Sequence, residues 1–211
     1  MEFIGVGMQQ TLLMLHGLTG TSKMIEQFAN KINPDGCNLV VPNGTFKHEE
    51  RGFCWWNYSL GHHKNKNNKI KVTDKLLREV QKSISYLIEK LPNEGDVIIG
   101  GFSQGAAMAQ IMLLSEISSR ISGLILLGTR SIEENKLREA LTKLKPVPVL
   151  WMHGTGDKLI KFEEAIELVK IFEEEGWEVT KIKHEKGHMI PLEYHNEIVD
   201  FVYKIYSNNT R

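Results

Sequence analysis

Apolar residues occur along the chain in short continuous runs, separated by longer segments with a helical period. The runs are TLLMLHG (11–17), NLVVPNG (38–44), DVIIGGFS (96–103), GLILLGT (123–129), VPVLWMHG (147–154) and WEVTKIKH (177–184). The first five do not alternate, which is typical of strands buried on both faces of a parallel sheet. The last run alternates between apolar and polar residues and therefore predicts a strand at the edge of that sheet.

The segments between these runs carry apolar residues three and four positions apart, as amphipathic helices do. We expect helices over 24–32, 76–88, 104–114, 137–144, 162–172 and 198–205. Pro92, Gly176 and Pro191 lie just outside three of these segments, where helices commonly stop or start. Strand and helix in turn predict an α/β fold, a mostly parallel sheet with helices on both faces. The 211 residues suit one domain, which we expect over 1–211 without a large cap.

One connection, residues 43–72, breaks the alternation because it is long and has neither period. Its first half is aromatic and its second half, 62–69, is polar. The aromatic residues are Phe46, Phe53, Trp55, Trp56 and Tyr58. They could cap one end of the core or line a substrate groove, and the candidates for substrate contact are Phe53, Trp55 and Trp56. The adjacent His62 and His63 have diverging side chains and no third ligand at a suitable spacing, so we expect no metal site.

The composition excludes several classes of function. Lysine and arginine number 26 and aspartate and glutamate 26, so no net charge attracts nucleic acid or an anionic membrane. No run approaches the roughly 18 apolar residues of a membrane span, and the first ten residues lack a basic segment before an apolar one. Cys37 and Cys54 are too few for a disulfide scaffold. We therefore expect a cytoplasmic protein without stable membrane insertion.

Candidate chemistry begins at GFSQG, residues 101–105, between the run 96–103 and a helical segment. A serine at the tip of a tight turn between strand and helix is held in a strained conformation. Side chains two positions before and after it would collide with their surroundings, so Gly101 and Gly105 suit this geometry. The pattern predicts that Ser103 stands exposed at the carboxyl end of the sheet as a nucleophile.

A serine nucleophile needs a base to take its proton and an acid to orient that base. Asp157 and His188 follow later strand runs, which gives the chain order Ser, Asp, His found in this kind of site. Glu133 and Glu134, after the run 123–129, are the alternative acids. Two backbone N–H groups are needed for the oxyanion, and those of Gln104 and Leu18 are best placed. Such chemistry uses no cofactor and no metal.

Several of these motifs together resemble the small carboxylesterase and acyl-protein thioesterase family of α/β hydrolases. The resemblance rests on LHGL (15–18), VPNG within 40–44, WWNY (55–58), GFSQG (101–105), HGTGD (153–157) and GH (187–188). Matched residue by residue, it implies Ser103, Asp157 and His188 as a catalytic triad, with Leu18 and Gln104 as oxyanion donors. The chain departs from the family at Ala106, where a second glycine is usual.

The expected function is therefore hydrolysis of carboxylic esters or thioesters through an acyl-enzyme, with a small-molecule ester or an acylated protein as substrate. Two alternatives stay open. One is a lysophospholipase or peptidase-like hydrolase that uses the same triad. The other is a non-catalytic binding protein on a hydrolase scaffold, against which the presence of all three triad residues argues.

Overall fold

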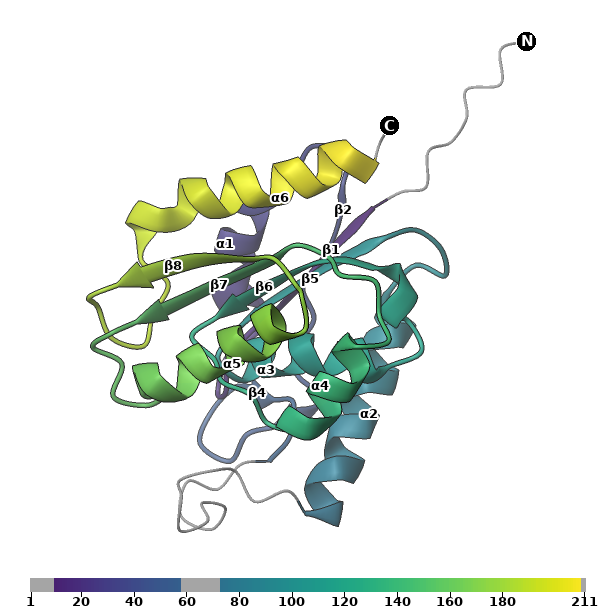
Figure 1. Ribbon diagram of the computed structural model, residues 1–211. Coiled ribbons are helices and arrows are strands. Elements are labelled where there is room, and N and C mark those ends of the chain that lie inside the picture. The colour runs from purple at the N-terminus through teal and green to yellow at the C-terminus, as the bar shows by residue number, and fades with distance from the viewer. Residues whose placement is uncertain (1–9, 58–72, 210–211) are drawn as a thin grey trace.

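The computed structural model describes residues 10–57 and 73–209, in which six parallel strands form one sheet with the order β2-β1-β5-β6-β7-β8 (Figure 1). The strands are β1 (Thr11–Leu15), β2 (Asn38–Val40), β5 (Val97–Phe102), β6 (Ile121–Leu127), β7 (Val149–Gly154) and β8 (Val179–His184). Five of them lie within runs that the hydrophobic pattern marked as strands, β6 begins two residues before its run, and β8 is at the sheet edge as predicted. The mostly parallel sheet of an α/β fold, expected from the sequence, is confirmed.

Six α-helices and three short 3-10 helices are described. They are α1 (Ser22–Ile32), α2 (Asp74–Lys90), α3 (Gln104–Ile111), α4 (Glu134–Leu141), α5 (Phe162–Glu174), α6 (His195–Asn209), η1 (Met112–Leu114), η2 (Ser118–Arg120) and η3 (Leu192–Tyr194). The run expected to be one helix over 104–114 changes to 3-10 geometry after Ile111. Between β6 and β7 the described chain has only α4, so no cap is inserted there.

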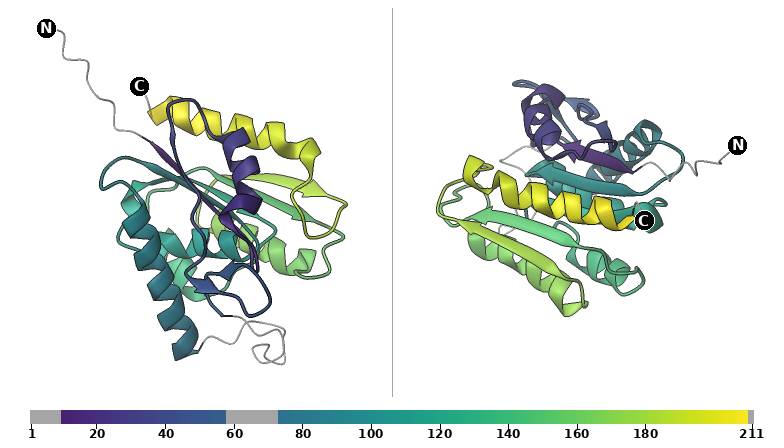
Figure 2. Two further views of the ribbon diagram at one scale, coloured as in Figure 1. Left: turned by 180° about the vertical axis from the view of Figure 1, so that it is seen from behind. Right: turned by 90° about the horizontal axis from the view of Figure 1, so that it is seen from above.

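The helices divide between the two faces of the sheet, which buries both (Figures 1 and 2). Helices α1 and α6 pack on one face, where Phe28 and Val202 belong to one apolar cluster. Helices α2, α3, α4 and α5 pack on the other, in a cluster that includes Leu87 and Phe172. Strand β5 lies between these layers with Val97 to Gly101 fully or almost fully buried, which explains its continuous apolar sequence.

The strand order places a switch point between β1 and β5. From β1 the chain crosses to β2 on one side, whereas β5, β6, β7 and β8 follow one another on the other side. In open α/β sheets, ligands bind outside the carboxyl ends of the strands at such a point. The turns after β1 and β5 therefore border the candidate site.

The aromatic connection contains structure that its sequence pattern did not predict. β3 (Phe46–Lys47) and β4 (Phe53–Cys54) form a short antiparallel pair. Phe53 also bridges to Gly20, in the turn after β1, so this pair is attached to the carboxyl end of the sheet. Residues 58–72, with Tyr58, His62 and His63, lie outside the described residues. In the described part of the chain, no helix is long and apolar enough to cross a bilayer.

Candidate active site

Ser103 occupies the turn between β5 and α3 with a left-handed backbone, φ 54° and ψ −115°. Its N–H donates to the carbonyl oxygen of Leu127 on β6 at 2.8 Å, and its carbonyl oxygen accepts from Ala107 in α3. A non-glycine residue with positive φ is strained and persists only where its surroundings hold it. The strained turn expected from the sequence is present, and the side chain of Ser103 lines a pocket.

The two glycines around Ser103 are required by close backbone approaches. A Cβ on Gly101 would lie 2.4 Å from the carbonyl carbon of Gly105. A Cβ on Gly105 would lie 2.2 Å from the carbonyl oxygen of Leu15, the last residue of β1. Real Cβ atoms do not approach backbone so closely, so α3 can begin against the end of β1 only with glycine at both positions.

Asp157 and His188 meet above the ends of β7 and β8. His188 Nδ1 lies 2.6 Å from Asp157 Oδ2, and Asp157 Oδ1 accepts N–H groups from Leu159 at 2.8 Å and Ile160 at 3.0 Å. Burial would raise the pKa of Asp157, but the hydrogen bonds from Ile160, His188 and Leu159 outweigh it and lower that pKa. The ionised carboxylate holds the imidazole with its proton on Nδ1, which leaves Nε2 as a proton acceptor.

His153, within β7, contacts the connection between β7 and α5 that contains Asp157 and Ile160. Its Nε2–H donates to the carbonyl oxygen of Ile160 at 2.9 Å and lies 3.4 Å from Asp157 Oδ2. Burial lowers the pKa of His153, which keeps the ring neutral. The alternative acids are engaged elsewhere, since Glu133 pairs with Lys136, and Glu134 with Arg138.

The two expected oxyanion donors border the same pocket as Ser103. Gln104 is the first residue of α3, and an N–H at that position has no acceptor within its helix. Leu18 lies in the turn after β1, beside Thr19, whose φ is 61°. The candidate donors therefore come from two chain segments that line the same pocket as Ser103.

His16 holds the turn that contains Leu18. Its Nε2 accepts the N–H of Gly44 at 2.8 Å, so its proton is on Nδ1, which donates to the carbonyl oxygen of Gly17 at 2.7 Å. Burial lowers the pKa of His16 and favours this neutral form. The turn after β1 is thereby tied to the start of the aromatic connection.

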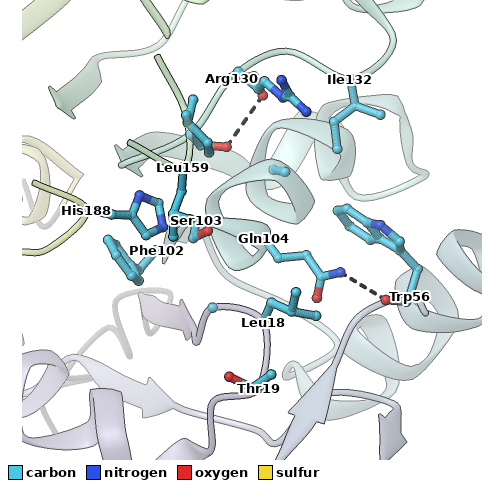
Figure 3. A pocket seen from close by; sticks show the side chains of 14 residues that line it. Leu18, Thr19, Trp56, Phe102, Ser103, Gln104, Arg130, Ile132, Leu159 and His188 are labelled. Carbon is cyan, nitrogen blue, oxygen red and sulfur yellow. Dashed lines mark hydrogen bonds between the residues drawn. The ribbon is translucent and has the colours of Figure 1, made fainter. Parts of the chain in front are cut away.

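The pocket has a volume of about 300 Å³ and contains both Ser103 and His188 (Figure 3). Its lining is mostly apolar, with one charged residue, Arg130, which forms an ion pair with Glu164. The lining residues are Gly17, Leu18, Thr19, Trp56, Phe102, Ser103, Gln104, Ala107, Thr129, Arg130, Ile132, Leu159, Ile160 and His188. A pocket of this size and character suits a small apolar group next to a reactive polar centre.

The three aromatic residues expected to contact substrate are placed differently from one another. Trp56 lines the pocket. Trp55 is fully buried in the core, where its Nε1–H donates to the carbonyl oxygen of His16 at 2.8 Å. Phe53 is half-buried, bonds to Gly20 through its backbone and is not among the lining residues. Trp55 and Phe53 are thus not among the lining residues of this pocket, and substrate contact by these aromatic residues stays a prediction.

Several lining residues were not singled out from the sequence, among them four that come soon after strands β6 and β7. Thr129 and Arg130 follow β6, and Leu159 and Ile160 follow β7. The rule that ligands bind at the carboxyl ends of parallel strands could have identified all four.

Metal-ligating side chains do not cluster in residues 10–57 and 73–209, where no group of three or more histidine, cysteine, aspartate or glutamate residues could hold an ion. Burial raises the pKa of both Cys37 and Cys54 to about 11, which favours the protonated thiol at both positions.

Comparison with known proteins shows what this chain is similar to. The profile of a family described as Phospholipase/Carboxylesterase matches residues 5–206. Acyl-protein thioesterase 1 of Candida albicans is 23% identical over 95% of this chain and 94% of its own length. Acyl-protein thioesterase 1 of Cryptococcus neoformans is 29% identical over 89 residues, and this chain spans only 37% of its length. The crystal structure of Arabidopsis thaliana SOBER1 has a TM-score of 0.69 at 19% identity and covers 94% of this chain and 99% of its own.

Proposed function

The chain belongs to the phospholipase/carboxylesterase family of α/β hydrolases, and on that premise we propose that it hydrolyses carboxylic esters or thioesters through an acyl-enzyme on Ser103. One observation carries the proposal. Ser103, on its strained turn, and His188, bonded to Asp157 at 2.6 Å, line a single pocket of about 300 Å³. Both relatives named acyl-protein thioesterase 1 are consistent with a thioester or ester substrate.

In the proposed reaction, Ser103 Oγ attacks the carbonyl carbon of the substrate while His188 Nε2 takes the serine proton. Asp157 keeps the imidazole oriented and stabilises its positive charge. The N–H groups of Leu18 and Gln104 hold the oxygen that becomes negatively charged. The tetrahedral intermediate then expels the alcohol or thiol, which receives the proton from His188, and leaves the acyl group on Ser103.

Water then hydrolyses the acyl-enzyme, with water as the nucleophile and Ser103 Oγ as the leaving group. His188 removes a proton from water, the hydroxide attacks the acyl carbonyl, and Ser103 Oγ leaves with the proton that His188 returns. All bonds change between substrate, water and these side chains, so the proposed reaction needs no cofactor. The substrate is a small ester or an acylated protein. The cytoplasmic location expected from the sequence remains a prediction.

A screen of p-nitrophenyl esters from acetyl to octanoyl, the matching acyl thioesters and a lysophospholipid tests the proposal. We expect turnover of esters or thioesters, with a loss on the order of 10⁶-fold in the Ser103→Ala variant. Preference for the lysophospholipid would favour the alternative hydrolase. A folded parent protein without turnover on any substrate would favour a binding protein, and parental rates in the Ser103→Ala variant would contradict the serine mechanism.

A further inference from the structure

The side chain of Gln104 makes two hydrogen bonds to the aromatic connection. Its Oε1 accepts the backbone N–H of Trp55 at 2.9 Å, and its Nε2–H donates to the carbonyl oxygen of Trp56 at 2.9 Å. The second bond is drawn in Figure 3, where Trp56 lies across the pocket from Ser103. Gln104 is only 8% exposed, so both bonds are shielded from water. One amide side chain thus pairs with backbone groups of two consecutive residues.

These backbone groups need such a partner because they follow β4 and lie outside the six-stranded sheet. A buried N–H or carbonyl without a partner destabilises the fold by about as much as a lost hydrogen bond. An unbranched side chain that carries one donor and one acceptor at the same end can satisfy both, and glutamine has that chemistry.

The two hydrogen bonds from Gln104 differ in how much the position of each tryptophan depends on them. Trp55 has further anchors, since its indole Nε1–H donates to His16 and its carbonyl oxygen accepts from Ser83. The bond from Gln104 holds the carbonyl of Trp56, the residue whose side chain lines the pocket. Loss of that bond should therefore move Trp56 more than Trp55.

We propose that the side chain of Gln104 is a positioning residue that fixes Trp56 at the pocket wall and so sets the preference for acyl-chain length. This inference rests on the proposed function, since it names what selects the substrate of that site. The same residue then has two separate roles. Its backbone N–H faces the reacting carbonyl, and its side chain holds the wall against which the acyl chain packs.

The ratio of kcat/KM for octanoyl and acetyl esters tests this proposal through a double-mutant cycle. The Gln104→Met variant removes both hydrogen bonds at nearly constant length, and the Gln104→Glu variant keeps only the acceptor for Trp55. The proposal assigns to Trp56 an apolar contact that only a long chain reaches, so we expect each variant to lower the ratio on the order of tenfold. A Trp56→Ala variant should lower it similarly, and adding Gln104→Met to that variant should have no further effect.

Gln10 provides a matched control because it is 2% exposed and its Nε2–H donates to Ser122 near the opposite end of the sheet. The Gln10→Met variant should leave the ratio at the parental value even if it lowers the melting temperature. Two results would overturn the proposal. One is a parental ratio in the Gln104→Glu variant, and the other is an effect of Gln104→Met that persists fully in the Trp56→Ala background.

A measurement independent of turnover separates this proposal from the proposed function. In protein labelled with ¹⁵N-tryptophan, the indole signal of Trp56 can be assigned from its loss in a Trp56→Phe variant. The Gln104→Glu substitution should shift or broaden that signal while those of Trp151 and Trp177, which lie elsewhere in the core, stay in place. An unchanged Trp56 signal would contradict the positioning role, whether or not the protein hydrolyses esters.

Discussion

Asp157 accepts three short hydrogen bonds, from the N–H groups of Leu159 and Ile160 and from His188 Nδ1. An Asp157→Asn substitution keeps the size of the side chain but places an amide where the carboxylate holds the imidazole. His188 then loses the partner that fixes its tautomer, and kcat should fall by about 10⁴-fold, less than for Ser103→Ala. Rates on p-nitrophenyl butyrate measure this. If Glu133→Gln or Glu134→Gln lowered kcat more than Asp157→Asn does, the acid would come from the segment after β6.

At the scale of elements, the contact between β1 and α3 sets the position of the serine turn. A methyl group at Gly105 would meet the carbonyl oxygens of Leu15 at 2.2 Å and His16 at 2.5 Å, so α3 would have to move away from β1. The Gly105→Ala variant should lose about 1–3 kcal/mol of unfolding free energy and most of its activity. Ala109, fully buried in the same helix, is the control. The Ala109→Gly variant should lose roughly 1 kcal/mol and retain turnover. Equal activity losses in both variants would show that α3 stability alone matters.

The aromatic connection shows where prediction from the sequence stops. Trp55 and Trp56 are adjacent residues of one type and are buried in the same apolar cluster, but only Trp56 also lines the pocket, and the sequence offered no way to foresee that difference. The difference depends on contacts with His16, Ser83 and Gln104, each at least 28 positions away in the chain. A local hydrophobic pattern carries no information about such contacts.

Substitution of each tryptophan by phenylalanine tests whether Trp55 serves stability and Trp56 serves the pocket. Trp55→Phe breaks the bond to His16 and should lower the melting temperature without changing the octanoyl to acetyl ratio. Trp56→Phe should change that ratio with a smaller effect on melting. The assignment would be reversed if Trp55→Phe altered the ratio and Trp56→Phe did not.

For the whole molecule, most of the secondary structure was predictable because buried parallel strands and amphipathic helices leave distinct patterns. The order of the strands and the pair formed by β3 and β4 were not, because pairing depends on side chains that are distant in sequence. Ser103, Asp157 and His188 were identifiable since each comes just after a strand, and parallel strands bring their carboxyl ends together. That Ile132 also lines the pocket could be learned only from the folded chain.

Buried histidines should make the stability of the whole protein depend on pH. Burial lowers the pKa of His16, His153, His184 and His195, each at most 6% exposed. Below about pH 6.5 the unfolded chain binds protons that the folded chain does not, so stability falls as pH falls. Each histidine contributes up to about 1.36 kcal/mol per pH unit. The pKa of Asp157 is lowered too, so its contribution is lost only at still lower pH.

Urea unfolding between pH 5 and 8 measures this dependence. A His195→Gln variant, which removes a ring packed against Phe28, should have a shallower slope below pH 6.5. A constant unfolding free energy from pH 5 to 8 would contradict the neutral, buried state of these rings.

The central claim is that Ser103 is a nucleophile activated by His188 and Asp157. Mass spectrometry of the full chain after treatment with a fluorophosphonate tests it most directly, since the reagent bonds covalently to an activated serine and needs no guess of the substrate. We predict one adduct per chain on the peptide that contains Ser103, slower labelling of Asp157→Asn, and none of Ser103→Ala. No adduct on the parent protein, or equal labelling of the Ser103→Ala variant, would contradict the claim.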